Sequence, residues 1–227
     1  MKTYHELQEG LQDPNIFKAF FLAGGPGSGK SHVVRHSTGG TGLRVVNSDD
    51  VFEKYLKDAG LSLKMPPEEW DANQRERVRA KKVTAARQKN YIEGRIGMVI
   101  DGTGAKYDKI RQQKADLEAL GYDCYMIFVN TSIDVALERN AKRERTVPED
   151  VAITLYNAVQ GNIGKFNSLF KGNMVIVDNN KPDEDIEKIT FKEVKRLLGK
   201  KVRNARAKPW IEMEMKNRGI TKKPKGW

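Results

Sequence analysis

Residues 24–31 read Gly24-Gly25-Pro26-Gly27-Ser28-Gly29-Lys30-Ser31, which fits the pattern G-x-x-x-x-G-K-S of a phosphate-binding loop. Glycines lack a Cβ, so such a loop can turn its backbone N–H groups toward phosphate oxygens. Lys30 can reach the β- and γ-phosphates, and the Ser31 hydroxyl can bind Mg²⁺. The stretch therefore predicts a nucleoside triphosphate site, with ATP and Mg²⁺ as the expected ligands.

The residues on either side of this loop agree with that prediction. An apolar run over 17–23 precedes the loop, as a buried strand should, and residues 30–37 after it favour a helix. Since helix N-termini attract anions, the first turn extends the phosphate site. The predicted nucleotide-binding residues of this segment are Gly25, Pro26, Gly27, Ser28, Gly29, Lys30, Ser31 and His32.

Composition limits the class of protein. Of the 227 residues 38% are hydrophobic, enough for a sizeable core. No stretch reaches the roughly 20 apolar residues of a membrane span. The first residues lack an apolar signal region, so we expect a cytoplasmic protein with no membrane partner. Cys124 is the only cysteine, which excludes a disulfide within the chain, and its apolar neighbours favour a place in the core.

Positive charge is concentrated near the C-terminus. Residues 191–227 hold 13 Lys or Arg and 3 Asp or Glu, whereas the remaining residues hold 28 and 27. This shift predicts a P-loop domain over 1–199 and a basic tail over 200–227. A basic arm attracts nucleic acid by counterion release, and Trp210 and Trp227 could stack on its bases. The alternative is that these tryptophans pack back on the body of the protein.

Short apolar runs alternate with longer helical segments along the chain. Such runs are typical of parallel strands that are buried on both faces. The expected strands are 19–23, 43–47, 97–101, 124–130 and 174–178, and the expected helices are 30–37, 67–93, 107–120, 132–142, 148–170 and 183–198. The alternation predicts a three-layer α/β fold with a five-stranded parallel sheet and ligands at the carboxyl ends of its strands, and the loop over 24–31 makes it a P-loop fold.

Two acids, Asp49 and Asp50, follow the second expected strand. A carboxylate at this end of the sheet can accept the proton of an attacking hydroxyl, as phosphoryl transfer to an alcohol requires. The same residues suit a helix N-cap, so one Asp could cap a helix while the other is catalytic.

A single acid, Asp101, ends the third expected strand and precedes Gly102-Thr103-Gly104. Such an acid can hold Mg²⁺ through water or orient the acceptor. No second acid follows it, which argues against a hydrolytic motor. A plain strand-to-loop turn is the alternative.

Arginines gather ahead of Pro148. Arg139 and Arg143 are four residues apart, hence on one face of a helix, and Arg145 follows them. Arginines on a lid can close over a triphosphate and neutralise charge that develops in the transition state. A solvated basic helix end is the alternative.

Four segments together resemble a known family. They are the loop 24–31, the Asn47-Ser48-Asp49-Asp50 strand end, the Ile100-Asp101-Gly102-Thr103 element and the lid string over 139–151. They look like the kinase domain of phage polynucleotide 5′-kinases and, more distantly, like zeta-toxin kinases. The resemblance covers about residues 17–180.

The resemblance implies roles for particular residues. Asp49 would be the general base, Asp101 an acid on the acceptor side, and Arg143 a lid contact to the ATP phosphates with Arg139 in support. The implied activity is transfer of the γ-phosphate of ATP to a hydroxyl, with the 5′-hydroxyl of a polynucleotide as the first expectation. A small nucleotide or sugar nucleotide as acceptor, and a non-catalytic nucleotide-binding adaptor, are the alternatives.

One position departs from the polynucleotide kinase pattern. Those kinases carry an arginine that grips the substrate phosphate three residues after the base, and this chain has Phe52 there. The acceptor contacts would then come from the following segment, where the candidates are Trp70, Arg75, Arg77 and Arg79.

Overall fold

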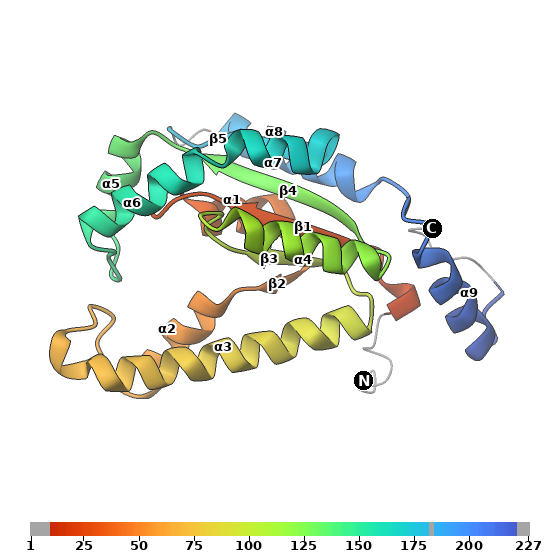
Figure 1. Cartoon of the computed structure of the whole chain (residues 1–227), viewed down its shortest axis with the longest axis horizontal. Coiled ribbons are helices and arrows are strands. Elements are labelled where there is room, and N and C mark those ends of the chain that lie inside the picture. Colours follow the sequence, from red (N-terminus) through yellow and green to blue (C-terminus); the bar gives the residue numbers. More distant parts are fainter. Residues whose placement is uncertain (1–9, 182–183, 222–227) are drawn as a thin grey trace.

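The computed structural model describes residues 10–181 and 184–221. Within them five strands form one sheet in the order β2-β3-β1-β4-β5, and each neighbouring pair is parallel. The strands are β1 Lys18–Ala23, β2 Arg44–Val46, β3 Met98–Asp101, β4 Asp123–Asn130 and β5 Met174–Asp178 (Figure 1). All five were expected from the sequence, with bounds that differ by one residue or less at each end.

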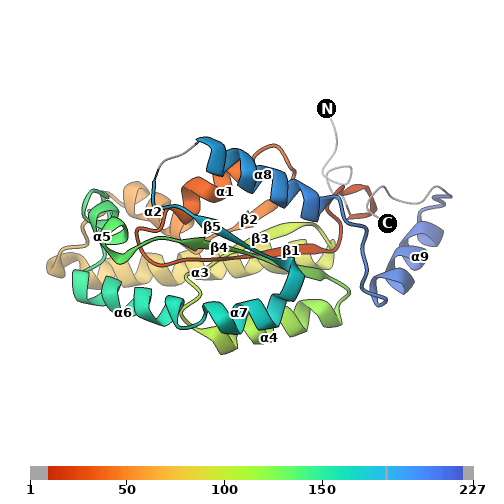
Figure 2. The ribbon, with the colours of Figure 1, turned by 90° about the horizontal axis from the view of Figure 1, so that it is seen from above.

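Helices cover both faces of the sheet, with α1 and α8 on one side and α4 and α7 on the other (Figure 2). The helices are α1 Lys30–Thr38, α2 Ser48–Asp58, α3 Trp70–Glu93, α4 Tyr107–Ala119, α5 Ile133–Ala141, α6 Glu149–Gln160, α7 Ile163–Phe170, α8 Glu184–Leu198 and α9 Ala207–Asn217. Short 3₁₀ turns occur at Gly10–Gln12, Pro67–Glu69 and Lys171–Asn173. The three-layer α/β P-loop fold is thereby confirmed.

The central strand shows why this sequence makes three layers. Phe20 and Leu22 point to the side of α1 and α8, whereas Phe21 points to the side of α4 and α7, and all three are buried. Successive residues of a strand point to opposite faces of the sheet, so a strand that is apolar at every position must be covered on both faces. Cys124 also lies in the core, where burial raises the pKa of its thiol.

The single helix expected over 148–170 is wrong, because the structure divides it into α6 and α7. The break falls at Gly161 and Asn162. The Asn162 amide donates hydrogen bonds to the carbonyl oxygens of Gly104 at 3.1 Å and Ala105 at 3.0 Å. This buried side chain ties the break to the loop after β3, a contact that local helix patterning does not reveal.

The segment after α8 packs back on the body. In α9, Ala207 and Ile211 are buried in the same core as β1, and the Trp210 ring meets the Phe17 ring edge-on at 5.3 Å. A Cβ on Gly121 would lie 2.9 Å from the backbone nitrogen of Ala207, so this close approach requires glycine. Trp210 thus packs on the body of the protein, which was the alternative to stacking on nucleic-acid bases. Trp227 lies outside the described residues.

Among the described residues, no helix combines the length and the apolar character that a membrane crossing needs.

Candidate active site

Glycines shape the phosphate-binding loop between β1 and α1. Gly27 and Gly29 have φ angles of 75° and 83°, in the left-handed region that favours glycine. A Cβ on Gly27 would lie 1.9 Å from the carbonyl oxygen of Ala136, and one on Gly29 would lie 2.3 Å from Nδ2 of Asn179. The loop is therefore wedged between α5 and the end of β5, and its backbone is fixed by contacts from distant segments.

Lys30 folds back over this loop. Its ammonium donates hydrogen bonds to the carbonyl oxygens of Gly24 at 2.6 Å and Gly25 at 3.0 Å. Burial lowers the pKa of Lys30 to about 8. The carboxylates of Asp101 and Asp49 oppose this shift, because they favour the charged form of the lysine. The lysine thus lies in the electrostatic field of both predicted catalytic acids.

A cavity of about 260 Å³ opens above the loop, and we call it the donor pocket. It is lined by Gly27, Gly29, Lys30, Ser31, His32, Arg139 and Arg143. The groups that line the donor pocket fit a magnesium-bound triphosphate. The cationic side chains and the N-terminus of α1 can bind the phosphates, and the exposed Ser31 hydroxyl can bind the ion. Ser28 Oγ is buried without a hydrogen-bond partner. Pro26 and Gly25 are buried in the loop and do not line the pocket.

The two lid arginines differ in how they are held. Arg139 donates from Nη1 to the carbonyl oxygen of Asn179 at 2.7 Å, so it is anchored to the end of β5. Arg143 is exposed, lines the donor pocket, and contributes to the lowered pKa of Lys30. Arg143 is thus the cation that can move toward a bound phosphate, while Arg139 is part of the fixed wall.

Asp49 and Asp50 lie in the first turn of α2, and neither caps it. The cap is Asn47, whose Oδ1 accepts a hydrogen bond from the backbone N–H of Asp49 at 2.7 Å. The expectation that one Asp caps the helix is therefore wrong, because an asparagine one position before Ser48 already does so. Burial, Glu53 and Asp49 raise the pKa of Asp50.

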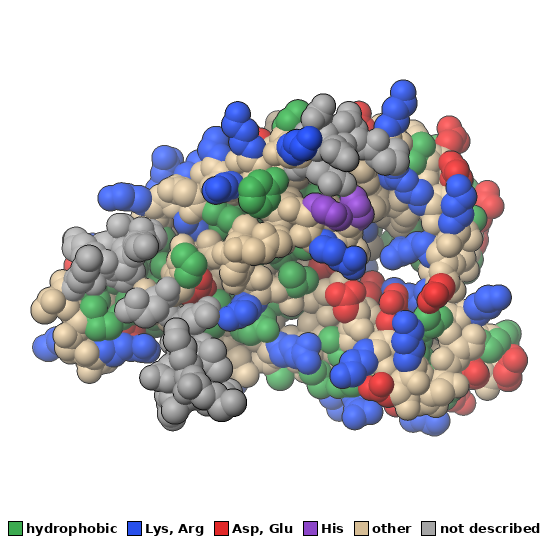
Figure 3. Space-filling model, turned by 180° about the vertical axis from the view of Figure 1, so that it is seen from behind, with side chains coloured by type: hydrophobic (Ala, Val, Ile, Leu, Met, Phe, Trp, Pro, Cys, Tyr) green, Lys and Arg blue, Asp and Glu red, His purple; other side chains and the backbone are tan. Residues whose placement is uncertain are grey.

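Asp101 ends β3, where it and Lys30 each affect the pKa of the other. Burial, together with the nearby carboxylates of Asp49 and Asp50, raises the pKa of Asp101 to about 6, against the opposing effect of Lys30. The structure therefore brings together the predicted Lys30, Asp49, Asp101 and Arg143. Figure 3 shows acidic side chains gathered beside a hollow, with basic side chains between them and the histidines.

A second cavity of about 510 Å³ lies beyond Asp101, and we call it the acceptor cavity. Its walls come from β3, α3, α4 and α6, with Asp101, Thr84, Gln88 and Leu155 among the lining residues. Three lysines also line it, namely Lys81, Lys106 and Lys109. Sequence reasoning missed these lysines, since exposed lysines on two helices look like an ordinary solvated surface until the helices converge.

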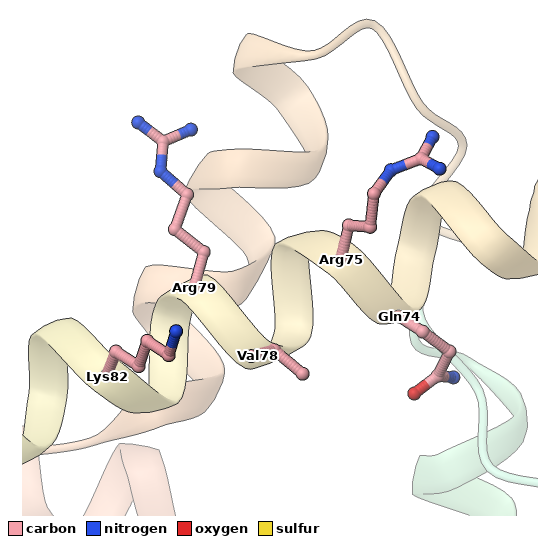
Figure 4. A pocket seen from close by; sticks show the side chains of 5 residues that line it. All are labelled: Gln74, Arg75, Val78, Arg79 and Lys82. Carbon is pink, nitrogen blue, oxygen red and sulfur yellow. The ribbon is translucent and has the colours of Figure 1, made fainter.

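The arginines expected from α3 as acceptor contacts lie elsewhere. Arg75 and Arg79 line a separate hollow on α3 together with Val78 (Figure 4). The Arg79 guanidinium lies 4.4 Å from the centre of the Tyr55 ring, and that of Arg77 lies 4.7 Å from the centre of the Phe52 ring. These contacts join α3 to α2 and do not reach the acceptor cavity.

Comparisons with known proteins agree with this fold. A structure of the PezAT chromosomal toxin–antitoxin system of Streptococcus pneumoniae has a TM-score of 0.57 and 15% identity, covering 86% of this chain and 92% of that one. A candidate kinase from Chloroflexus aurantiacus has a TM-score of 0.55 and 16% identity, covering 79% and 97%. At such identities these likenesses show the fold alone, and no curated protein matches the chain at a significant level.

The family comparison separates the two resemblances noted in the sequence. The family comparison does not support the resemblance to polynucleotide 5′-kinases. It supports the more distant resemblance, to zeta-toxin kinases. The match covers residues 3–187, which includes the phosphate-binding loop, both acid sites and the lid, and this chain therefore belongs to the Zeta toxin family.

Proposed function

We propose that this protein transfers the γ-phosphate of ATP to a hydroxyl of a small anionic molecule that binds in the acceptor cavity. One observation carries the proposal: Asp101 lines the acceptor cavity and also lies in the field of Lys30 in the donor pocket. Phosphoryl transfer to an alcohol needs the acceptor hydroxyl held beside the γ-phosphate, and an acid in the acceptor cavity that interacts with Lys30 of the donor pocket supports such a pairing of sites.

The proposed reaction is an in-line substitution at the γ-phosphorus. The acceptor oxygen forms a bond to that phosphorus, the bond from phosphorus to the β–γ bridging oxygen breaks, and ADP leaves with the electron pair. The acceptor proton passes to the carboxylate of Asp49. Lys30 and Arg143 balance the phosphate charge, and Mg²⁺ held through Ser31 would supply further positive charge to the phosphate oxygens.

The acceptor cavity favours a small acceptor over a polymer. Its volume of about 510 Å³ falls within the range of sites for small molecules. Lys81, Lys106 and Lys109 have no carboxylate partner among the described residues, so their charge is available to an anionic group of the acceptor. A phosphorylated sugar or a nucleotide has the size and the charge that this wall selects.

The 5′-hydroxyl of a polynucleotide is the second candidate acceptor, and the basic C-terminal segment favours it. Residues 191–227 carry 13 Lys or Arg against 3 Asp or Glu. Such a segment would hold a polyanion by its phosphates while its end enters the cleft.

A transfer screen separates the two candidates. The purified full-length chain is incubated with Mg²⁺ and γ-labelled ATP, and the label is followed onto sugar phosphates, sugar nucleotides, mononucleotides, and 5′-hydroxyl DNA and RNA. We expect transfer to a small anionic acceptor. Labelling of oligonucleotides alone would replace the first candidate with the second, and release of phosphate to water without any labelled acceptor would contradict both.

A further inference from the structure

The lid loop between α5 and α6 is closed by one asparagine. Nδ2 of Asn140 donates to the carbonyl oxygen of Val147 at 2.7 Å, and the Val147 N–H donates to Oδ1 of Asn140 at 3.1 Å. Asn140 is 4% exposed, so water competes little with these bonds. The loop over 141–147 is therefore a closed unit with a defined shape.

This loop carries two arginines that serve different sides of the cleft. Arg143 lines the donor pocket. Arg145 reaches α2, where Nη2 lies 3.3 Å from Oδ1 of Asp49 and Nε lies 3.3 Å from Oε1 of Glu53. Figures 1 and 2 place α2, α5 and α6 at the same end of the molecule, so this contact bridges the lid and the acid-bearing helix.

The position of Arg145 is determined by three contacts at once. Besides the two carboxylates, its guanidinium lies 5.6 Å from the centre of the buried Phe52 ring. The side chain of Arg145 is 17% exposed, whereas that of Asp49 is 64% exposed. A planar guanidinium shielded on an aromatic ring has little freedom, so it can fix the orientation of the more exposed carboxylate.

We propose that Arg145 is a positioning residue, which holds Oδ1 of Asp49 so that Oδ2 is presented to the acceptor hydroxyl. The inference rests on the proposed function, since it requires Asp49 to accept the proton. It gives the two lid arginines different tasks: Arg143 acts on the phosphate of the donor, and Arg145 acts through the base.

Substitutions at two positions of the same loop test this division. Arg145→Ala should lower kcat about tenfold, the order expected for one charge-assisted hydrogen bond, and leave the affinity for a non-hydrolysable ATP analogue within about twofold. Arg145→Lys should recover part of the loss, because it restores the positive charge but not the planar guanidinium that can contact Asp49 and Glu53 at once. Lys142→Ala is the matched control, since Lys142 is exposed and pairs with Glu138 of α5, away from the cleft.

A double substitution distinguishes positioning from a general effect on folding. In an Asp49→Asn background, Arg145→Ala should add less than about a twofold loss, because the group through which Arg145 acts is already gone. Turnover is followed as label transferred to the best acceptor of the screen above, and thermal melting confirms that each variant is folded.

The outcomes separate this inference from the proposed function. If the wild-type chain transfers phosphate and Arg145→Ala behaves like Lys142→Ala, the positioning role is overturned alone. A second tenfold loss in the Asp49→Asn background, or an equal loss of nucleotide affinity, also overturns it. Absence of transfer by the wild-type chain overturns the proposed function, and the positioning role with it.

Discussion

Lys30 of the donor pocket and Asp101 of the acceptor cavity interact electrostatically, yet the two regions are built in opposite ways. Most of the donor pocket comes from one continuous loop, whose backbone is fixed by Gly27 and Gly29. The acceptor cavity takes its walls from segments spread over residues 21–155. The difference teaches that the donor is specified by local backbone geometry, whereas the acceptor is specified by the packing of helices. Each of the following predictions tests whether the two regions act separately.

Asp49→Asn should have the largest effect, and the loss should fall on turnover and not on ATP binding. Loss of a general base lowers kcat by roughly 10²–10⁴-fold, while ATP affinity should persist because the donor pocket is not lined by Asp49. Steady-state kinetics and calorimetric titration with an ATP analogue measure the two quantities. Asp50→Asn is the control; if it alone loses activity, the base is Asp50.

Lys30→Ala should come next, and it should affect both nucleotide binding and turnover. The ammonium lies at the mouth of the loop, where it is bonded to Gly24 and Gly25. Its removal should lower transfer by about 10²-fold or more and weaken ATP binding, because it stabilises charge on the phosphates. Turnover within a factor of about ten of wild type would speak against the phosphate-binding role of this loop.

Lys106→Ala should raise the KM for the acceptor about tenfold and leave the affinity for ATP unchanged. A hydrogen bond to a charged group is worth about that much, and Lys106 lines the acceptor cavity but not the donor pocket. Lys89→Ala is a suitable control, since Lys89 pairs with Glu93 on α3 and does not line the acceptor cavity. An equal rise in the KM for ATP would show that the two regions are not separate.

The pH profile of kcat/KM for ATP should show a limb from each region. The pKa of Asp101 is raised to about 6, so its carboxylate is lost as pH falls through that value. The pKa of Lys30 is lowered to about 8, so its positive charge is lost as pH rises through that value. Because kcat/KM reports the free enzyme, the profile should be a bell between these limbs, and a flat profile across that range would contradict it.

Trp210→Ala should have the smallest effect on both sites, because it lies in neither. Loss of its edge-on contact with Phe17 should lower the free energy of unfolding by about 2 kcal/mol, as expected for a half-buried aromatic ring. Denaturant unfolding measures this loss, and kinetics should stay at the wild-type level. Unchanged stability together with weaker nucleic-acid binding would restore the stacking role first considered for this tryptophan.

Sequence alone was sufficient for features that depend on neighbouring residues. The loop 24–31, the five strands and the position of Asp101 at the end of β3 are all local patterns, and the structure has them where they were expected, whereas α2 and α9 were not among the expected helices. A glycine pattern specifies a turn, and an apolar run specifies a buried strand, because each depends on residues within a few positions. The prediction of one helix over 148–170 was wrong because the break at Asn162 depends on a hydrogen bond to Gly104, which is distant in the sequence.

Only the tertiary structure decided which side chains share a wall. Lys81 of α3 and Lys106 beside α4 meet at the acceptor cavity, Arg145 of the lid meets Asp49 of α2, and Trp210 of α9 meets Phe17 beside β1. Each of these pairs is separated by many residues, and each depends on how helices pack. Periodicity predicts which face of a helix is buried, but not which element packs against that face. The residues of the donor pocket that lie in the loop 24–31 could therefore be predicted from the sequence, whereas the residues that line the acceptor cavity depend on how the helices pack.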